Sequence, residues 1–215
     1  MRMETVGEAP DAADLMLVRD WLDPGSASAL VERLLHELPW QVHRVRLFGR
    51  EVDSPRLSCW MGDPGAAYRY SGVRHEPHAW AEALLPIRDR LVRETGVAFN
   101  SALANLYRDG RDCMGWHSDD EPELGERPMI ASLSLGAARR FVLKHRRDPG
   151  RKLAFELTNG SLLVMRGDTQ EAYRHALPRT AKPVGPRINL TFRRILPDPR
   201  AITENAGSRT SKASP

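Results

Sequence analysis

The chain has 215 residues, 41% of them hydrophobic, which is enough for one domain with a substantial core. Lysine and arginine number 32 against 28 acidic residues, so the net charge of +4 only weakly indicates an anionic partner. Two cysteines, Cys59 and Cys113, exclude a disulfide framework and favour reduced thiols. Residues 1–14 do not resemble a signal peptide, and no apolar run reaches membrane-spanning length. We therefore expect a soluble intracellular protein, cytoplasmic or, in a eukaryote, nuclear.

The N-terminal part of the chain predicts two helices. Residues 1–14 are expected to be a flexible arm, and residues 15–22 a short strand that enters the fold. The turn at 23–26 predicts a helix start, because leucines with helical spacing follow it. A second helical region is expected at 79–95, where Gly96 is a natural cap.

Residues 40–70 are strand-like and rich in arginine. Within them, Leu47-Phe48-Gly49-Arg50-Glu51 predicts a hairpin tip. An exposed phenylalanine there can fill the gap that a flipped base leaves in a stack, although Phe48 can equally be an ordinary buried strand residue. Tyr68 and Tyr70 share a strand face and suit either base stacking or structural packing.

From residue 99 onward the sequence predicts strand after strand. Many short strands separated by turns favour a sandwich or barrel, and a jelly roll would bring His117 and His175 together. Asn159-Gly160 between two alternating runs is a strong hairpin signal. The small, polar tail after Pro199 is expected to be disordered. The expected strands are 99–107, 113–118, 129–135, 139–145, 152–157, 161–166, 172–177 and 187–195.

One short segment, Trp116-His117-Ser118-Asp119-Asp120-Glu121, concentrates metal-binding residue types. Alternate side chains of a strand share a face, so His117 and Asp119 point the same way. An imidazole and a carboxylate suit an open iron(II) site once a second histidine joins them, and His175 is the best later candidate. A lone His-x-Asp occurs by chance in many proteins, so the assignment depends on its partners.

The strand at 187–193 carries a polar face. Alternation places Arg187, Asn189, Thr191 and Arg193 on one side and apolar residues on the other. Two arginines on a polar face whose back lies in the core suit a ligand with two carboxylates. The alternative is a pair of solvated arginines on an edge strand.

A basic segment follows between residues 139 and 152. Its composition suits a phosphate track, with a solvated loop as the alternative. Its cations are Arg139, Arg140, Lys144, Arg146, Arg147, Arg151 and Lys152, interrupted by His145 and Asp148.

Together these segments resemble the AlkB family of iron(II)- and 2-oxoglutarate-dependent nucleic-acid demethylases. The resemblance runs from about residue 15 to residue 199. It implies an α+β, mainly β fold: a double-stranded β-helix (jelly-roll) core, a supporting helical layer and an N-terminal nucleotide-recognition hairpin region. The matching pieces are 105–109, 117–122, 131–136, His175 and 187–193. The implied division is a flexible arm (1–14), helices and nucleotide-recognition lid (15–97), dioxygenase domain (98–196) and disordered tail (200–215).

The resemblance also implies residue roles. Iron(II) would be held by His117, Asp119 and His175, which are also the catalytic residues. Arg187 would pair with the distal carboxylate of 2-oxoglutarate and Arg193 would hold the end near the metal. Hydrogen bonds to the cosubstrate would come from Asn105, Tyr107, Asn189 and Thr191.

Substrate contacts follow in the same way. Phe48, with Gly49, would be the aromatic finger and Arg56 would touch the duplex backbone. Tyr70, beside Tyr68, would clamp the base. Asp120 and Glu121 abut the metal strand, and Glu121 would favour the positive charge of 1-methyladenine or 3-methylcytosine.

The implied reaction is oxidative demethylation of a flipped base in DNA. Dioxygen and 2-oxoglutarate become succinate and carbon dioxide, and the methyl group leaves as formaldehyde. Residues 47–49 match members that act on duplex DNA, whereas residues 116–122 look equally like members that prefer single strands and RNA. The alternatives are an RNA or single-strand demethylase, a hydroxylase of a protein or metabolite, a binding protein without catalysis and, more remotely, a zinc hydrolase. We expect a monomer with alkylated DNA or RNA as partner and no membrane.

Overall fold

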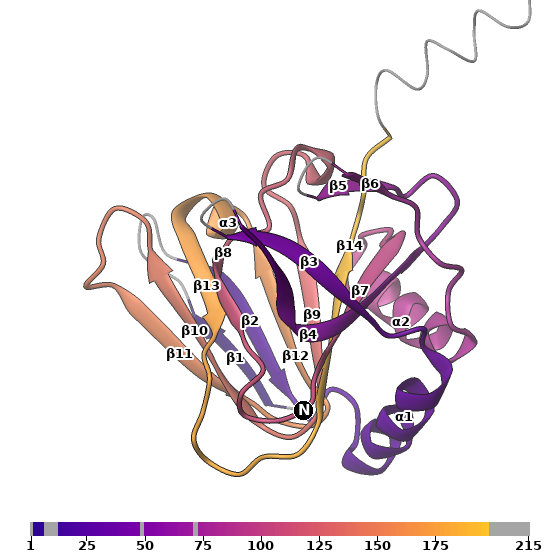
Figure 1. Cartoon of the computed structure of the whole chain (residues 1–215). Helices are drawn as coiled ribbons and strands as arrows, with labels where there is room; N and C mark the ends of the chain where they lie inside the picture. Colours follow the sequence, from indigo (N-terminus) through magenta and orange to yellow (C-terminus); the bar gives the residue numbers. More distant parts are fainter. Residues whose placement is uncertain (1, 7–12, 48–49, 71–72, 198–215) are drawn as a thin grey trace, which may run out of the picture.

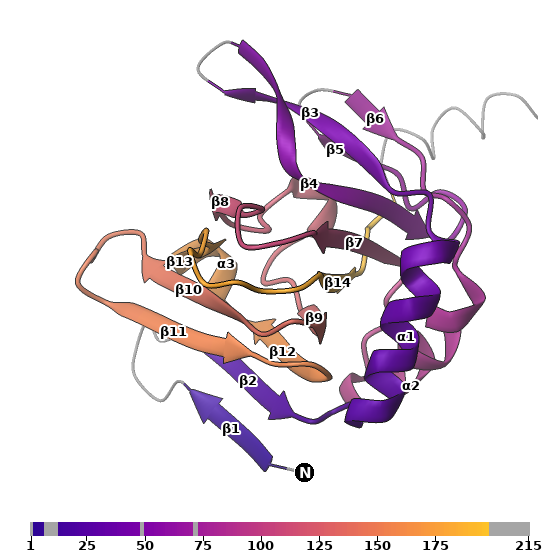
Figure 2. The same ribbon diagram turned by 60° about the horizontal axis from the view of Figure 1, so that its bottom comes forward.

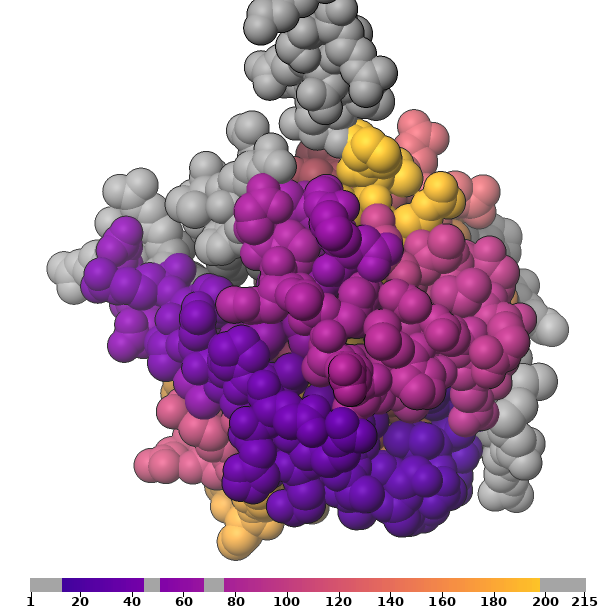
Figure 3. Space-filling model, turned by 90° about the vertical axis from the view of Figure 1, so that its right-hand side faces the viewer, coloured from indigo at the N-terminus to yellow at the C-terminus, as the bar shows by residue number. Residues whose placement is uncertain are grey.

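Two antiparallel sheets lie face to face in the computed structural model, and helices cover the outer side of the larger sheet (Figure 1, Figure 2). In a space-filling view of that side, α1 (Pro24–Glu37) and the segment that contains α2 (Leu85–Thr95) form most of the surface (Figure 3). None of the helices in the described ranges is long and apolar enough to cross a membrane. The described residues are 2–6, 13–47, 50–70 and 73–197.

The larger sheet has eight strands in the order β1-β2-β12-β9-β14-β7-β4-β3. Its strands are β1 (Arg2–Val6), β2 (Asp14–Arg19), β12 (Ser161–Arg166), β9 (Ile130–Gly136), β14 (Arg187–Arg193), β7 (Ser101–Tyr107), β4 (Arg50–Gly62) and β3 (Gln41–Leu47). The smaller sheet is β11 (Lys152–Leu157), β10 (Arg139–His145), β13 (Tyr173–Leu177) and β8 (Met114–His117). Strands β5 (Tyr68–Tyr70) and β6 (Val73–His75) pair as a separate two-stranded sheet. Three further elements are short helices of one turn each: η1 (Glu82–Leu84), η2 (Pro122–Leu124) and α3 (Thr169–Ala172). This arrangement confirms the predicted jelly roll with its helical layer.

Local sequence explains the two longer helices. The Asp23 carboxylate accepts a hydrogen bond from the backbone N–H of Ser26 at 3.0 Å, which caps α1, and Pro24 occupies its first turn. Gly96 ends α2 with a φ of 74°, a conformation that glycine adopts without strain. Both helices were predicted, and α1 begins where its start signal lies, but α2 begins at Leu85, later than the expected start at residue 79, and the 3-10 turn η1 precedes it.

The core has two layers because the larger sheet is covered on both faces. One cluster joins α1 to the sheet and includes Leu34, Leu133 and Leu190. The other fills the space between the sheets and includes Leu143 and Leu163. Strand β14 therefore turns its apolar residues toward the helices and its polar residues into the space between the sheets, as its alternation predicted.

The structure departs from the expected domain division. Residues 2–6, expected in a flexible arm, form β1 and pair with β2. The sheet also crosses the proposed boundary at 97/98, because β4 pairs with β7 and β2 with β12. The predicted disordered tail, 200–215, lies outside the described residues.

The predicted Asn159-Gly160 hairpin is wrong. The chain turns there, but β11 pairs with β10, whereas β12 pairs with β9 and β2. The turn is tied to the larger sheet and to the start of α1: Asn159 Oδ1 accepts from the Gly136 N–H at 2.9 Å, and the Gly160 carbonyl accepts from the Leu22 N–H at 3.0 Å. Because of these contacts, the chain passes from β11 in the smaller sheet to β12 in the larger sheet, and the two strands do not pair with each other.

The Gly160 turn supplies a stability test. Gly160 has a φ of 79°, and an added Cβ would lie 2.1 Å from the Leu22 carbonyl oxygen. We expect Gly160→Ala to lower the free energy of unfolding by about 3 kcal/mol, from left-handed strain plus the clash. Gly65→Ala is the matched control, since its φ of 87° is similar but no atom lies within 4 Å. It should lose about 1 kcal/mol. Urea unfolding measures both, and equal losses would contradict the clash.

Candidate functional site

Neighbouring strands of the smaller sheet bring the two predicted histidines together. His117 of β8 and His175 of β13 are register partners, and their Nε2 atoms lie 3.1 Å apart. Asp119 follows β8, with its Oδ1 atom 3.9 Å from Nε2 of His117. The ligand atoms of the three residues all lie within 4.8 Å of one another, so the cluster could hold a metal ion.

Hydrogen bonds outside the cluster orient these side chains. His117 Nδ1 lies 2.9 Å from the Gly115 carbonyl oxygen, so this nitrogen carries the proton and Nε2 turns its lone pair to the cluster. The backbone N–H of Asp119 donates to Oε1 of Gln170 at 3.0 Å. Gln170 is fully buried in α3 and was missed by sequence analysis, because nothing in a one-turn helix indicates such a contact. Ser118 Oγ also donates to the Tyr173 carbonyl, which fastens β8 to β13.

Burial sets the charges of the cluster. It lowers the pKa of His175 to about 3 and also lowers the pKa of His117, so both rings are neutral at pH 7. Burial alone would raise the pKa of Asp119, but Arg193, 2.7 Å away, and the two imidazoles lower this pKa to about 2. Two neutral imidazoles and one carboxylate are the donor set of open iron(II) sites, and they are deprotonated as ligands must be.

A second feature of the site is the buried guanidinium of Arg187. This side chain is 2% exposed and donates through Nη2 to Ser134 Oγ at 2.8 Å and to Asn189 Oδ1 at 2.9 Å. Its Nε atom is buried without a hydrogen-bond partner, and no carboxylate of the described chain forms an ion pair with it. Burial lowers the pKa of Arg187 to about 10, so it remains a cation at pH 7. A buried, unpaired charge is costly, which fits a pocket that an anionic ligand completes.

The metal cluster and Arg187 line one cavity. The polar face of β14 and the facing residues of β7 complete its wall, so all six predicted cosubstrate residues meet there. They are Asn105, Tyr107, Arg187, Asn189, Thr191 and Arg193. Ser132 and Ser134 of β9 form hydrogen bonds to Asn189 and Arg187, respectively. Neither serine was predicted to lie in the site, although their period-two spacing is visible in the sequence.

A neighbouring cavity of about 210 Å³ opens between β4 and β8, over the same metal cluster. His43, Ser58 and Glu121 line it. The Oε2 atom of Glu121 is buried and has no hydrogen-bond partner in the part of the chain that the structure describes, and burial raises the pKa of this carboxyl group. The cavity therefore offers an acidic acceptor beside the metal residues.

Two arginines lie differently from their predicted positions. Arg56, expected on a duplex backbone, is 9% exposed and lines this cavity, with its Nε donating to Asn105 Oδ1 at 2.8 Å and its Nη1 to Ser54 Oγ. Arg139, expected in a phosphate track, is 3% exposed and donates to the carbonyls of Asp109, Asp112 and Pro178. The family resemblance predicted a backbone contact for Arg56, and the basic composition of its segment predicted one for Arg139, but tertiary contacts bury both side chains.

The remaining predicted residues divide into two groups. Asp120 is exposed and paired with Arg146, so it points away from the cavity that Glu121 lines. His145, which interrupts the basic segment, is buried against Tyr173. Phe48 and Gly49 lie outside the described residues, and so do the side chains of Tyr68 and Tyr70.

Comparisons with known proteins agree with this geometry. The 2OG-Fe(II) oxygenase superfamily matches residues 14–193. "Alpha-ketoglutarate-dependent dioxygenase alkB homolog 3" of Homo sapiens is 38% identical over 189 residues, 84% of this chain and 65% of the relative. "DNA oxidative demethylase ALKBH2" of Mus musculus is 37% identical over 187 residues, 80% of this chain and 77% of the relative.

The chain spans just under two thirds of the length of the first of these relatives. A solved structure, OsALKBH1, shares the fold with a TM-score of 0.59 and 18% identity, covering 87% of this chain and 99% of that one. Together with the match to the superfamily over residues 14–193, these relatives show that the chain belongs to the AlkB family of 2OG-Fe(II) oxygenases.

Proposed function

We propose that this chain is an iron(II)- and 2-oxoglutarate-dependent dioxygenase that demethylates N-alkylated bases in DNA. The observation that carries the proposal is Arg187, a buried cation that has no carboxylate partner among the described residues and lies in the same cavity as two neutral imidazoles and a carboxylate. A keto-diacid satisfies both demands, since one end chelates a metal and the other pairs with a guanidinium. The names of the relatives, a dioxygenase and a DNA demethylase, support the same class.

Each residue of the cavity has a separate task in this proposal. Arg187 receives the distal carboxylate, and Asn105, Tyr107, Asn189 and Thr191 offer hydrogen bonds along the cosubstrate. Arg193 holds Asp119 at 2.7 Å and stands beside the metal end. Bound iron(II), with 2-oxoglutarate and dioxygen, supplies the oxidant that hydroxylates the N-methyl carbon. The resulting hydroxymethyl base then loses formaldehyde.

The adjoining cavity suits the alkylated base. Bases methylated on a ring nitrogen of the pairing edge, such as 1-methyladenine and 3-methylcytosine, carry a positive charge. The buried, unpartnered Oε2 of Glu121 beside the metal residues favours such a cation over a neutral base. Arg56 holds the wall between the two cavities through Asn105, so we assign it a positioning task there.

Strand preference is the finer part of the proposal. Leu47 of β3 is the register partner of Arg50 of β4, and we assign the aromatic finger to Phe48, which with Gly49 lies outside the described residues. A phenylalanine at a hairpin tip suits a wedge in duplex DNA. Tyr70, in β5, is assigned to clamp the flipped base. Methylated RNA and single-stranded DNA present the same lesion charge to Glu121, so they belong in the same experiment.

The first prediction is the reaction itself. Methylated oligonucleotides, as duplex DNA, single-stranded DNA and RNA, are incubated with the protein, iron(II) and 2-oxoglutarate. Mass spectrometry should show the loss of one methyl group per lesion, with one succinate formed for each methyl group lost.

Asp119→Ala should abolish turnover and the binding of manganese(II), a redox-inert substitute for iron(II), because the carboxylate acts on the metal. The affinity of this variant for oligonucleotides should be unchanged. Wild-type turnover by that variant would refute the ligand assignment, and succinate formed only with other substrates would favour a different hydroxylase.

The second prediction concerns the cosubstrate anchor. With manganese(II) bound, a hundredfold excess of 2-oxoglutarate over its Kd should stabilise the wild type by about 2.7 kcal/mol. Arg187→Met should lose this stabilisation, because it removes the cation that the distal carboxylate pairs with. Arg194→Met is the matched control, since Arg194 directly follows β14 and is exposed. Thermal unfolding with and without 2-oxoglutarate measures this stabilisation in each variant. A wild-type increase of the unfolding midpoint in Arg187→Met would rule out the anchoring role of Arg187.

The third prediction concerns the hairpin tip. Phe48→Ala should lower demethylation of duplex DNA more than that of single strands, because only a duplex leaves a gap to fill. Val52→Ala is the control, since Val52 lies on the same hairpin and is 36% exposed. It should affect both substrates alike. The measurement is the initial rate of demethylation on single- and double-stranded substrates of the same sequence. An equal loss of rate on both substrates in Phe48→Ala would refute the wedge role of Phe48.

A further inference from the structure

The outer face of the smaller sheet carries a row of uncompensated cations. Lys144 of β10 is the register partner of Arg174 on β13 and of Lys152 on β11, so three basic side chains stand side by side on adjacent strands. Arg174 and Lys152 are exposed and Lys144 is half-buried, and none of the three forms an ion pair within the described chain. Like charges opposite one another destabilise a sheet, so the row is costly to the free protein.

An exposed tryptophan lies at the end of this row. Trp116 of β8 is 44% exposed, and the Lys144 ammonium lies 4.5 Å from the centroid of its ring. Strand β13 separates β8 from β10, so the indole lies across β13. One ring face meets Lys144 while much of the side chain remains open to solvent. An exposed aromatic plane beside cations is the combination that single-stranded nucleic acids recognise, through base stacking and phosphate contact.

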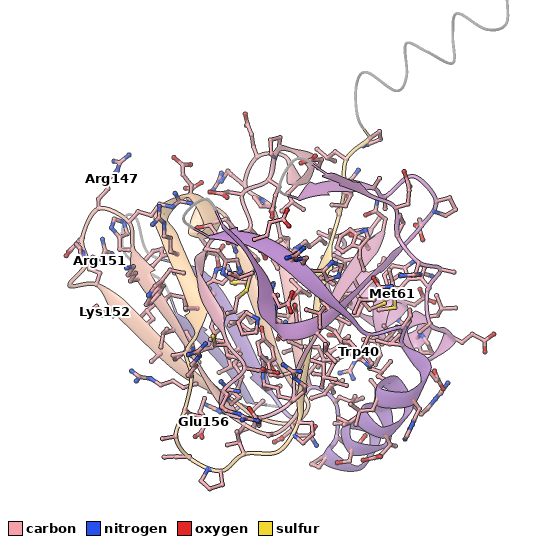
Figure 4. The ribbon with its side chains drawn as sticks, in the orientation of Figure 1. Trp40, Met61, Arg147, Arg151, Lys152 and Glu156 are labelled. Carbon is pink, nitrogen blue, oxygen red and sulfur yellow. The ribbon has the colours of Figure 1, made fainter. Side chains whose placement is uncertain are left out.

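The charge of this face is uneven along the strands. Arg147, Arg151 and Lys152 project outward at the β10–β11 end of the sheet (Figure 4). Glu156, the single acid of β11, lies at the far end of the strand (Figure 4). Positive charge therefore gathers at the end of the face that also holds Lys144 and Arg174.

The row lies directly behind the metal cluster. Trp116 precedes His117 and Arg174 precedes His175, so in each strand one residue faces the cavity and its neighbour faces the row. Strand β8 is the edge of its sheet, and the substrate cavity opens between β8 and β4. A strand with one base in that cavity has only to cross this edge to reach Trp116.

We propose that Trp116 and the row of Arg174, Lys144 and Lys152 form a second binding surface, which holds a single-stranded segment of nucleic acid next to the flipped base. Phosphates contact the three cations, and one unstacked base lies on the open face of the Trp116 ring. This inference rests on the proposed function, and it specifies where the substrate strand continues outside the cavity. It binds unmethylated strands equally, because none of its residues lies in the cavity.

Salt-dependent binding tests the cations without catalysis. Fluorescence anisotropy of unmethylated oligothymidylate, without iron, gives Kd across a sodium chloride series. Lys144→Gln/Arg174→Gln should reduce the slope of log K against log salt by about 1.4, since each phosphate contact on a single strand contributes about 0.7. The control with the same charge change is Arg33→Gln/Arg93→Gln, on α1 and α2, which should leave the slope unchanged. Equal slopes for the two double variants would overturn the proposal.

The aromatic part has its own readout. Trp116→Ala should weaken oligothymidylate binding about tenfold and abolish the part of the fluorescence quenching that depends on this indole. Unchanged affinity and quenching would refute stacking. Oligouridylate in parallel distinguishes RNA from DNA as the bound strand. Binding of anionic phospholipid vesicles by the row, with no change in oligonucleotide binding, would overturn the proposal in favour of a lipid surface.

The outcome is separable from that of the proposed function. Lys144→Gln/Arg174→Gln should keep a wild-type unfolding midpoint or a higher one, because it relieves repulsion between neighbours. It should demethylate a short methylated trinucleotide at the wild-type rate but lose affinity for long strands. Row-dependent binding without demethylation by the wild type would refute the enzyme and leave the surface. Equal losses on short and long substrates would refute the surface and leave the enzyme.

Discussion

Two guanidinium groups are held between the sheets on one face of β14, and the rest of the site is arranged around their charge. Arg193 is neutralised by Asp119 at 2.7 Å, so the candidate metal carboxylate is also the internal counter-ion of the fold. Arg187 has two hydrogen bonds but no counter-ion in the described chain. Because a buried charge of this kind costs several kcal/mol, the fold tolerates it only with a large core on the other face of the strand. Ile188, Leu190 and Phe192, all fully buried, provide that core.

The jelly-roll topology explains how residues far apart in sequence form one site. His117 and His175 are separated by 58 positions, but β8 and β13 are neighbours in the smaller sheet. Strand β14 lies in the larger sheet, and its polar face meets these histidines across the space between the sheets. The two histidines of the candidate metal cluster and the buried guanidinium of Arg187 thus come from opposite sheets. The distance between these histidines and Arg187 therefore depends on the packing of the two sheets, which is rigid.

Period-two alternation carried the information that predicts which residues of β14 meet in this cavity. The two faces of β14 follow from strand geometry alone, whereas Asp119 meets His117 as predicted although β8 ends at His117. Predictions from residue type were weaker. Asn159-Gly160 has the composition of a hairpin turn, but tertiary hydrogen bonds to Gly136 and Leu22 direct the two strands into different sheets. Arg56 and Arg139 look like phosphate ligands in sequence, yet their donors meet Asn105 and loop carbonyls, which no local pattern encodes.

Alternation also gives strands β8 and β13 two chemistries at once. Their inward residues are neutral imidazoles, which need a dry, apolar environment to keep a low pKa. Their outward residues are a tryptophan and an arginine, which tolerate solvent. Only the backbone of these two strands separates the inward residues from the outward ones. In the proposed binding mode, the same hydrogen-bonded strand pair therefore positions both the base in the cavity and the nucleic-acid segment on the outer face. In the proposed binding mode the nucleic-acid strand crosses the edge strand β8, so that one base enters the cavity while the backbone stays on the outer face of the smaller sheet.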